Sequence, residues 1–247
     1  MKTFLIFTLC FLLCLSPLVA SAKTKTQEKK DVYPSFFAGE PKSLLNLMIV
    51  ITILAFLPSI TLLMSSFTRI VIVLSLLRQA IGIHQLPPNQ VVIGLSLFLT
   101  FFIMSPTYEK IHTEALSPYM KNQISHEEFL SRCKEHLSSF MIKFTKEKDL
   151  DLFIQMAKVP RPSNEKEVPF SVLVPAFALS ELKRAFQMGF LIYIPFLIVD
   201  MVVASVLVSA GMMMLPPIFI SLPFKLMLFV LVDGWNLLVA SILKSFS

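Results

Sequence analysis

Long apolar runs and one charged stretch divide the chain. A helix of about 20 apolar residues is long enough to cross a membrane, and three of the four runs reach that length. The other run has only 14 residues, which is short for a helix surrounded by lipid. In chain order the runs cover residues 44–64, 91–104, 186–215 and 218–243. The pattern predicts an all-α, membrane-associated protein with two apolar helical hairpins, residues 43–104 and 186–247.

The stretch between the hairpins, residues 105–185, is predicted to be a soluble, periplasmic helical segment. It holds 12 Lys and Arg against 11 Asp and Glu, so it is highly charged but nearly neutral. Ser125 and Glu128 have the spacing of a capping box, and apolar residues follow them at helical spacing. We expect a second short helix over residues 147–158 and a third that starts at Pro175.

The N-terminus has the pattern of a secretory leader. Lys2 precedes an apolar core, and Ala-Ser-Ala at residues 20–22 is a typical cleavage site. We therefore expect residues 1–22 to be a cleaved signal peptide and residues 23–42 to be a flexible polar segment. Cleavage would leave Cys133 as the one remaining cysteine, which excludes an internal disulfide.

Composition favours a membrane protein and argues against several other classes. The chain is 55% hydrophobic and has a mean hydropathy of +0.74, above the range of ordinary soluble domains. The net charge of +6 is scattered, without a basic stripe that would bind nucleic acid. We find no metal-ligand spacing, phosphate-binding glycine motif or nucleophile–base pair. The sequence predicts neither an enzyme nor a cofactor.

Three charged residues lie inside the last two apolar runs, namely Asp200, Lys225 and Asp233. A charge at the centre of a membrane helix costs about 2.5–3.5 kcal/mol on insertion scales, so these side chains should face protein or water. We expect Lys225 to pair with an acid across a hairpin or subunit boundary, with Glu181 as a further candidate. A solvated or proton-relay role is the alternative.

Other residues of these runs have simpler interpretations. Ser205 and Ser209 are spaced for close helix packing. If residue 23 lies outside the membrane, Arg69 and Arg78 fall on the cytoplasmic side and act as topology determinants. By hydropathy alone, the turn between the last two runs would then face the cytoplasm.

That turn has an unusual composition. Residues 209–217 read SAGMMMLPP, where small polar residues would be typical. Met212, Met213 and Met214 carry unbranched, polarizable thioethers, which fill irregular gaps and repack readily. Gly211 precedes them, and the prolines at 216–217 would stiffen the far side of the turn.

Two long blocks resemble a known family. Residues 66–106, beginning SFTRIVIVLSLLRQAIG, and residues 174–235, which include SAGMMMLPPIFISLPFKLMLFVLVDGW, are similar to the FliP family of flagellar type III protein export. The same family includes the injectisome R subunit. The resemblance implies a pore-forming subunit of the export gate, which passes unfolded proteins across the inner membrane.

The resemblance also implies partners and a location. Several copies, expected to be a pentamer, would assemble helically with FliQ-type and FliR-type subunits into a channel, next to FlhA/FlhB-type export proteins and membrane lipid. This assembly would belong to the flagellar basal body in the inner membrane, with a large part on the periplasmic side. The methionine turn would form a flexible seal, supported by Gly211, Pro216 and Pro217.

Three alternatives stay open at this point. The chain could be the injectisome homologue of the same gate, although the leader favours the flagellar member. It could be a small-solute or ion transporter that uses Asp200, Lys225 and Asp233. It could also be an assembly scaffold, with the pore lined by other subunits.

Overall fold

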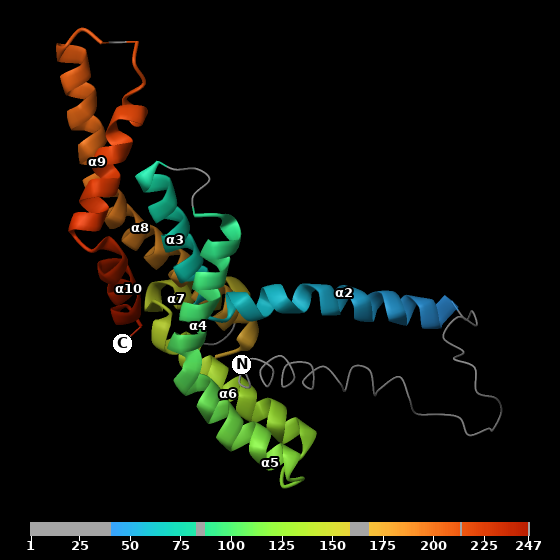
Figure 1. The fold of residues 1–247 in the computed structure, drawn as a ribbon. Coiled ribbons are helices and arrows are strands. Elements are labelled where there is room, and N and C mark those ends of the chain that lie inside the picture. The colour runs from blue at the N-terminus through green and yellow to red at the C-terminus, as the bar shows by residue number, and fades with distance from the viewer. Residues whose placement is uncertain (1–40, 83–86, 159–167, 213, 247) are drawn as a thin grey trace, which may run out of the picture. The chain divides into compact units, whose positions relative to one another are not determined.

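Helices are the only regular elements in the part of the chain that the computed structural model describes, residues 41–82, 87–158, 168–212 and 214–246 (Figure 1). The prediction of an all-α fold is therefore confirmed. The expected leader, nearly all of the polar segment 23–42, and Met213 lie outside the described residues. In chain order the helices are α2 (Pro41–Leu63), α3 (Phe67–Ile81), α4 (Asn89–Ile111), the π-helix η2 (His112–Leu116), α5 (Ser117–Met120), α6 (His126–Phe144), α7 (Glu147–Ala157), α8 (Phe170–Ser209), α9 (Pro217–Leu231) and α10 (Gly234–Lys244).

The chain divides into two compact units, and the first comprises Met1–Thr61 and Lys110–Lys134. Its described part includes most of α2, the π-helix, α5 and the start of α6. The Tyr119 and Phe129 rings stack with their centroids 4.8 Å apart. Phe129 is fully buried, so this aromatic contact holds the short helix α5 against the start of α6.

The predicted capping box is confirmed on its serine side. The backbone N–H of Glu128 donates to the Ser125 hydroxyl at 3.2 Å. The Glu128 carboxylate accepts a hydrogen bond from Arg132, one turn further along the helix. The expected helices α6 and α7 both form.

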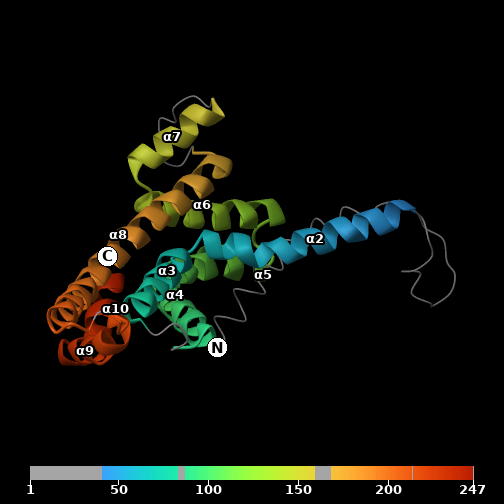
Figure 2. The same cartoon turned by 90° about the horizontal axis from the view of Figure 1, so that it is seen from above.

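The second unit comprises Leu62–Glu109 and Glu135–Ser247, and its core forms where α3 packs along α8 (Figures 1 and 2). The inward face of α3 is built from apolar residues at helical spacing, and all of them are buried. Further core residues come from α4, α6, α7, α9 and α10. The buried positions of α3 are Ile70, Val73, Leu74, Leu77, Ala80 and Ile81.

Helix α8 is longer than the sequence pattern predicted. It spans 40 residues, about 60 Å, and contains both Pro175 and Pro195. The expectation that a helix starts at Pro175 is wrong, because Pro169 is the N-cap and its carbonyl already accepts from the N–H groups of Val172 and Leu173. The expected boundary between residues 185 and 186 lies inside this helix, and the boundary at 104–105 lies inside α4.

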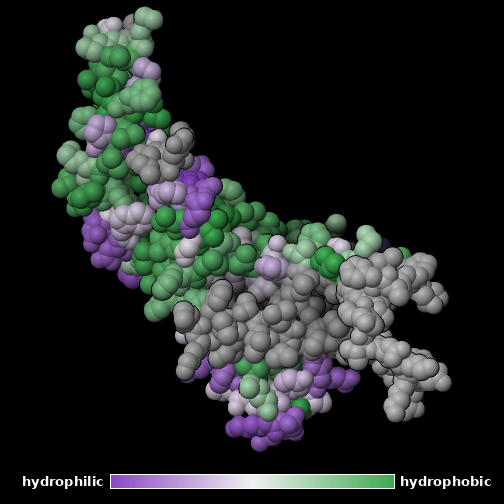
Figure 3. Space-filling model, turned by 45° about the vertical axis from the view of Figure 1, so that its right-hand side comes forward, coloured by the Kyte–Doolittle hydropathy of each residue, from purple (hydrophilic) through white to green (hydrophobic). Residues whose placement is uncertain are grey.

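Two helical stretches among the described residues are long and apolar enough to cross a membrane. One is the run of α4, η2 and α5, Asn89–Met120, and the other is α8, Phe170–Ser209. The pair α9 and α10 would add a third span if it counted as one, although it is bent by 64°. Hydrophobic side chains cover most of the visible face of the α8–α9 hairpin (Figure 3). The chain is therefore a membrane-associated protein.

Gly189 allows α3 and α8 to approach closely. A Cβ atom at this position would lie 2.2 Å from Leu76 Cδ1 and 3.2 Å from Leu76 Cβ. We predict that Gly189→Val destabilises the protein by about 1–3 kcal/mol, because the branched side chain would force the two helices apart. The unfolding midpoint in detergent measures this effect.

Gly94→Val is the matched control for that substitution. Gly94 also lies inside a long apolar helix, α4, but a Cβ there would meet nothing within 4 Å. This variant should unfold close to the parent. Equal destabilisation by the two valines would contradict the close-approach explanation.

Candidate functional site

The methionine turn lies at the tip of the α8–α9 hairpin. Helix α8 ends in a Schellman motif: the N–H of Gly211 donates to Val208 O at 3.0 Å, and the N–H of Met212 donates to Leu207 O at 2.9 Å. Gly211 has φ +75°, a left-handed conformation that a side chain would strain. The glycine is therefore required by the way α8 stops.

Two prolines begin the second arm of the hairpin. Pro216 is the N-cap of α9 in an extended conformation, and Pro217 is the first helical residue. Proline fits this position because the first N–H groups of a helix have no intrahelical acceptor. The chain between Gly211 and Pro216 is thus bounded by two fixed helix ends.

Met212 and Met214, the two described methionines of this turn, project outward. Met212 is 50% exposed and Met214 is 98% exposed. A fully exposed methionine at the end of an apolar hairpin places its thioether where another surface can contact it.

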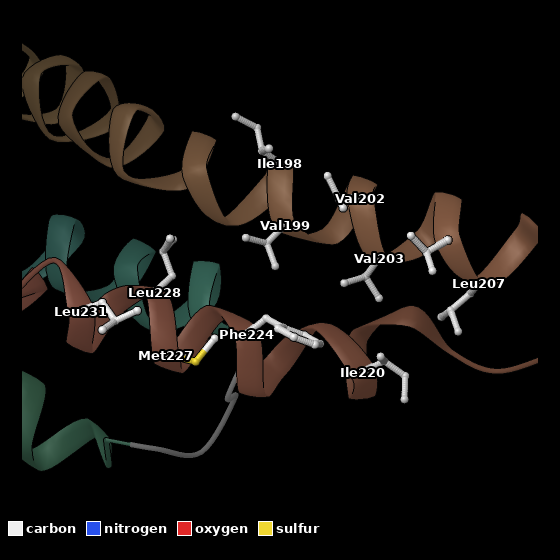
Figure 4. Close-up of a pocket in the computed structure, with 11 residues that line it drawn as sticks. Ile198, Val199, Val202, Val203, Leu207, Ile220, Phe224, Met227, Leu228 and Leu231 are labelled. Carbon is white, nitrogen blue, oxygen red and sulfur yellow. The ribbon is translucent and has the colours of Figure 1, made fainter. Parts of the chain in front are cut away.

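An apolar groove runs between the two arms of the hairpin. Its volume is about 520 Å³, and its lining comes entirely from α8 and α9. Figure 4 shows that Val199 and Val203 of α8 point toward Phe224 of α9. The groove carries almost no polar surface, so its chemistry suits hydrocarbon and not a charged solute.

A pair of opposite charges lies within the same hairpin. Lys225 of α9 donates to Asp200 Oδ2 of α8 at 2.7 Å and to the backbone carbonyl of Ala80 at 3.1 Å. The Ser221 hydroxyl donates to Asp200 Oδ1 at 2.6 Å. The Lys225 side chain is only 4% exposed, and the Asp200 side chain is 34% exposed. The lysine therefore has both a counter-charge and a carbonyl acceptor.

Asp233 lies outside the Lys225–Asp200 pair. It is exposed, has φ +50°, and lies at the break between α9 and α10. The next residue, Gly234, packs so closely on Phe229 that a Cβ would lie 2.3 Å from its ring atoms. Asp233 thus belongs to the bend, while Asp200 is the acid that contacts Lys225.

A second buried charge network holds the base of α8. Arg69 Nε donates to Glu181 Oε2 at 2.9 Å, and Arg69 Nη2 binds Glu181 Oε1. Both side chains are fully buried. Arg69 Nη1 also donates to the carbonyl and hydroxyl oxygens of Ser245, and its guanidinium stacks 3.7 Å from the centroid of the Phe246 ring.

The interpretation of Arg69 as a topology determinant alone misses this network. A signal for it exists in the sequence, because Arg69 precedes Val73 and Leu77 at intervals of four and so shares the apolar face of α3. A cation on that face must be buried and paired. Its partner lies 112 residues away, which no local pattern reveals.

The remaining predicted residues make local contacts. Arg78 donates to the Asn89 side chain and to the carbonyl of Pro87. Ser205 and Ser209 are exposed, and each donates to a carbonyl of its own helix. Among the described residues, no group of three or more His, Cys, Asp or Glu side chains could hold a metal ion.

Helix α7 is held on α8 by a third polar cluster. Ser180 accepts from the Lys146 N–H at 3.0 Å and donates to Asp149 Oδ2 at 2.8 Å, while Lys183 binds Asp149 Oδ1. Burial raises the pKa of the Asp149 carboxyl. Hydrogen bonds from Lys183 and Ser180, together with the positive charges of Lys183 and Lys146, lower this pKa by more than burial raises it. The net pKa is below its ordinary value.

The fold and this site define an all-helical, membrane-associated protein whose apolar hairpin ends in an exposed methionine turn. Comparison with known proteins identifies the family: the chain belongs to the FliP family, whose model matches residues 50–242. It is thus a flagellar biosynthesis protein, as the family resemblance had indicated.

Three curated relatives named flagellar biosynthetic protein FliP align over most of their length. That of Bacillus subtilis strain 168 is 55% identical over 85% of this chain and 97% of the relative. The Aquifex aeolicus protein is 56% identical over 82% of this chain and 85% of its own. The Pectobacterium carotovorum protein is 56% identical over 81% of this chain and 77% of its own length.

The first prediction from this site concerns the Asp149 cluster. Asp149→Asn should lower the free energy of unfolding by about 1–3 kcal/mol at neutral pH, because charged hydrogen bonds are lost. The folded pKa of Asp149 lies below its unfolded value of about 3.9. The stabilisation is therefore complete above about pH 5 and declines as pH falls through the folded pKa.

Unfolding midpoints of the parent and the Asp149→Asn variant between pH 3 and pH 8 test this dependence. The control is Glu147→Gln, an exposed carboxylate on the same helix. A difference between parent and Asp149→Asn that stays constant down to pH 3 would show that the carboxylate charge is not what holds α7.

A second prediction concerns the Arg69–Glu181 pair. Arg69→Met alone or Glu181→Leu alone should destabilise the protein by about 3–5 kcal/mol, because each leaves a buried charge without its partner. The double variant should recover much of that loss. A loss in the double variant that equals the sum of the two single losses, measured by unfolding in detergent, would argue against direct coupling of the two charges.

Proposed function

We propose that this chain is a pore-forming subunit of the flagellar type III protein-export gate, with Met212–Met214 as a flexible seal. The observation that carries the proposal is the methionine turn at the tip of an apolar hairpin, where Met214 is 98% exposed. Membership of the FliP family supports the flagellar system over the injectisome alternative.

The chemistry of the turn suits a seal. Methionine side chains are flexible and apolar, so several turns facing one axis would exclude hydrated ions and still separate for a peptide of any sequence. The two fixed helix ends on either side of the turn confine the movement to the methionine tip. A gate for unfolded proteins needs this lack of sequence preference.

The proposal includes an assembly. We expect several copies, as a pentamer, together with FliQ-type and FliR-type subunits, in contact with FlhA/FlhB-type proteins, at the inner membrane and with a large part on the periplasmic side. Large apolar side chains are exposed along α8 and α9, which supports burial against other subunits or lipid. Examples are Phe190, Leu191, Met201, Phe219 and Leu231.

The buried charges favour this function over solute transport. Lys225 and Asp200 already satisfy each other, and Asp233 is exposed at the helix break. A transported ion would have to displace the lysine from its partner. A channel whose selectivity lies in the methionine tip makes no such demand.

The test replaces all three methionines of the turn. Met212→Ala, Met213→Ala and Met214→Ala in one chain should raise ion conductance through the closed, assembled complex severalfold, since alanine leaves the axis open. Conductance of purified complexes in planar bilayers, or ion leakage in cells, measures the effect.

The matched control is Met156→Ala on α7, a methionine that is 77% exposed but lies outside the turn. It should leave conductance unchanged. If the triple variant assembles and conducts no better than the parent, the seal is wrong. Cross-links from a stalled export substrate to residues 212–214 would further separate a pore lining from a scaffold.

A further inference from the structure

Helix α8 is too long for its whole length to lie in lipid hydrocarbon. Its 40 residues span about 60 Å, whereas the hydrocarbon core of a bilayer is about 30 Å thick. The ion pairs that join α8 to α3 and α7 lie in its first half, up to Lys183. Residues 188–209 form about 33 Å of helix with Asp200 as their one charged residue. The second half therefore fits the hydrocarbon, and the membrane surface falls close to residues 183–187.

One exposed face of α8 changes from polar to apolar at this level. Lys183, Phe186, Gln187 and Phe190 are spaced three or four residues apart, so they share a face of the helix, and all four are exposed. The Lys183 side chain is 48% exposed, and the Phe186 and Phe190 residues are 54% and 67% exposed. A long cationic side chain next to large apolar ones can extend its charge to the headgroup level of a membrane while its stem covers apolar surface.

Three further cations lie beside Lys183. Arg184 is the next residue of α8. Lys146 is the N-cap of α7, and its ammonium lies 3.3 Å from Gln187 Oε1 of α8. Lys143 lies three residues before Lys146, in the last turn of α6. Lys143, Lys146, Lys183 and Arg184 together form a basic cluster where α6, α7 and α8 meet.

This basic cluster has an excess of positive charge. Over residues 143–151 and 183–184 the chain carries five cations and three carboxylates. One of the three carboxylates, that of Asp149, is buried and is bound by Lys183 and Ser180. The exposed side of the cluster is therefore suited to an anionic group.

We propose that the basic cluster binds the phosphate group of an anionic phospholipid at the point where α8 enters the membrane. Lysine ammonium groups attract phosphate as point charges, and the Arg184 guanidinium can donate two parallel hydrogen bonds to it. The acyl chains of the same lipid lie along Phe186 and Phe190. Basic residues next to a membrane helix are a common recognition site for anionic headgroups.

A lipid fits this surface better than a free anion because the cations and the exposed phenylalanines share one face. The bound headgroup would hold the base of α8 and the α7 cluster at the membrane surface, and so set the depth of the helix. The proposal rests on α8 as a membrane helix and does not depend on the methionine seal.

The experiment is a lipid titration of the full chain in detergent, read by native mass spectrometry. The two probes are phosphatidylglycerol, which is anionic, and phosphatidylcholine with the same acyl chains, which is zwitterionic. The parent should bind phosphatidylglycerol at least about tenfold more tightly, because each basic residue near a headgroup contributes about fivefold. Inorganic phosphate at the concentration of the lipid should not displace it.

The test variant is Lys143→Gln, Lys146→Gln and Arg184→Gln in one chain. Lys183 stays unchanged because it binds Asp149. This variant should bind the two lipids about equally. The variant Lys143→Arg, Lys146→Arg and Arg184→Lys keeps all charges and should keep the preference of the parent.

The matched control removes three exposed lysines outside the basic cluster, by Lys121→Gln, Lys134→Gln and Lys158→Gln. It has the same net charge as the test variant and should bind like the parent. Equal binding of the two lipids by the parent, displacement by inorganic phosphate, or an equal loss of preference in the control would each overturn the proposal. The parent comparison needs no variant, so poor folding of the glutamine variant does not remove the test.

Discussion

The packing of α3 along α8 depends on one buried ion pair, Arg69 with Glu181. Both side chains are fully buried, so either charge alone would be very unfavourable in this position. The guanidinium uses its remaining donors on Ser245 and stacks on Phe246, so the chain end is joined to the same point. One charge pair thus fixes α3, α8 and the segment after α10 relative to one another, and the apolar core of the second unit forms around them.

This arrangement gives the two ends of α8 different surroundings. The first half, with Glu181, Lys183 and the α7 cluster, is held by ion pairs and buried hydrogen bonds. The second half is almost wholly apolar and packs on α9, where the polar contacts are those of Asp200 with Lys225 and Ser221 and of Lys225 with the Ala80 carbonyl. Movement of the tip therefore needs the loss of few polar contacts, whereas movement of the base would break many.

Local sequence patterns predicted the elements whose causes are local. The capping serine and the helical spacing indicated α6 and α7, and the glycine and the prolines around the methionines indicated a turn bounded by helix ends. They did not predict that α8 continues through Pro175, because a helix can tolerate an internal proline when neighbouring helices support it. Local patterns also did not predict the Arg69–Glu181 pair, because only the packed fold brings α3 and α8 together.

The α8–α9 hairpin contains a buried charge that is paired within the chain and an exposed apolar surface that is not covered. A buried charge demands a partner within the chain, and Lys225 has one in Asp200 and another in the Ala80 carbonyl. The exposed apolar surface, which ends at Met214, has no comparable partner among the described residues of the turn. Because apolar surface is stabilised by any apolar contact, the proposed gate would close this tip against copies of itself and exchange that contact for a passing chain. In that proposal, polar anchoring at the base and non-specific apolar contact at the tip are complementary requirements.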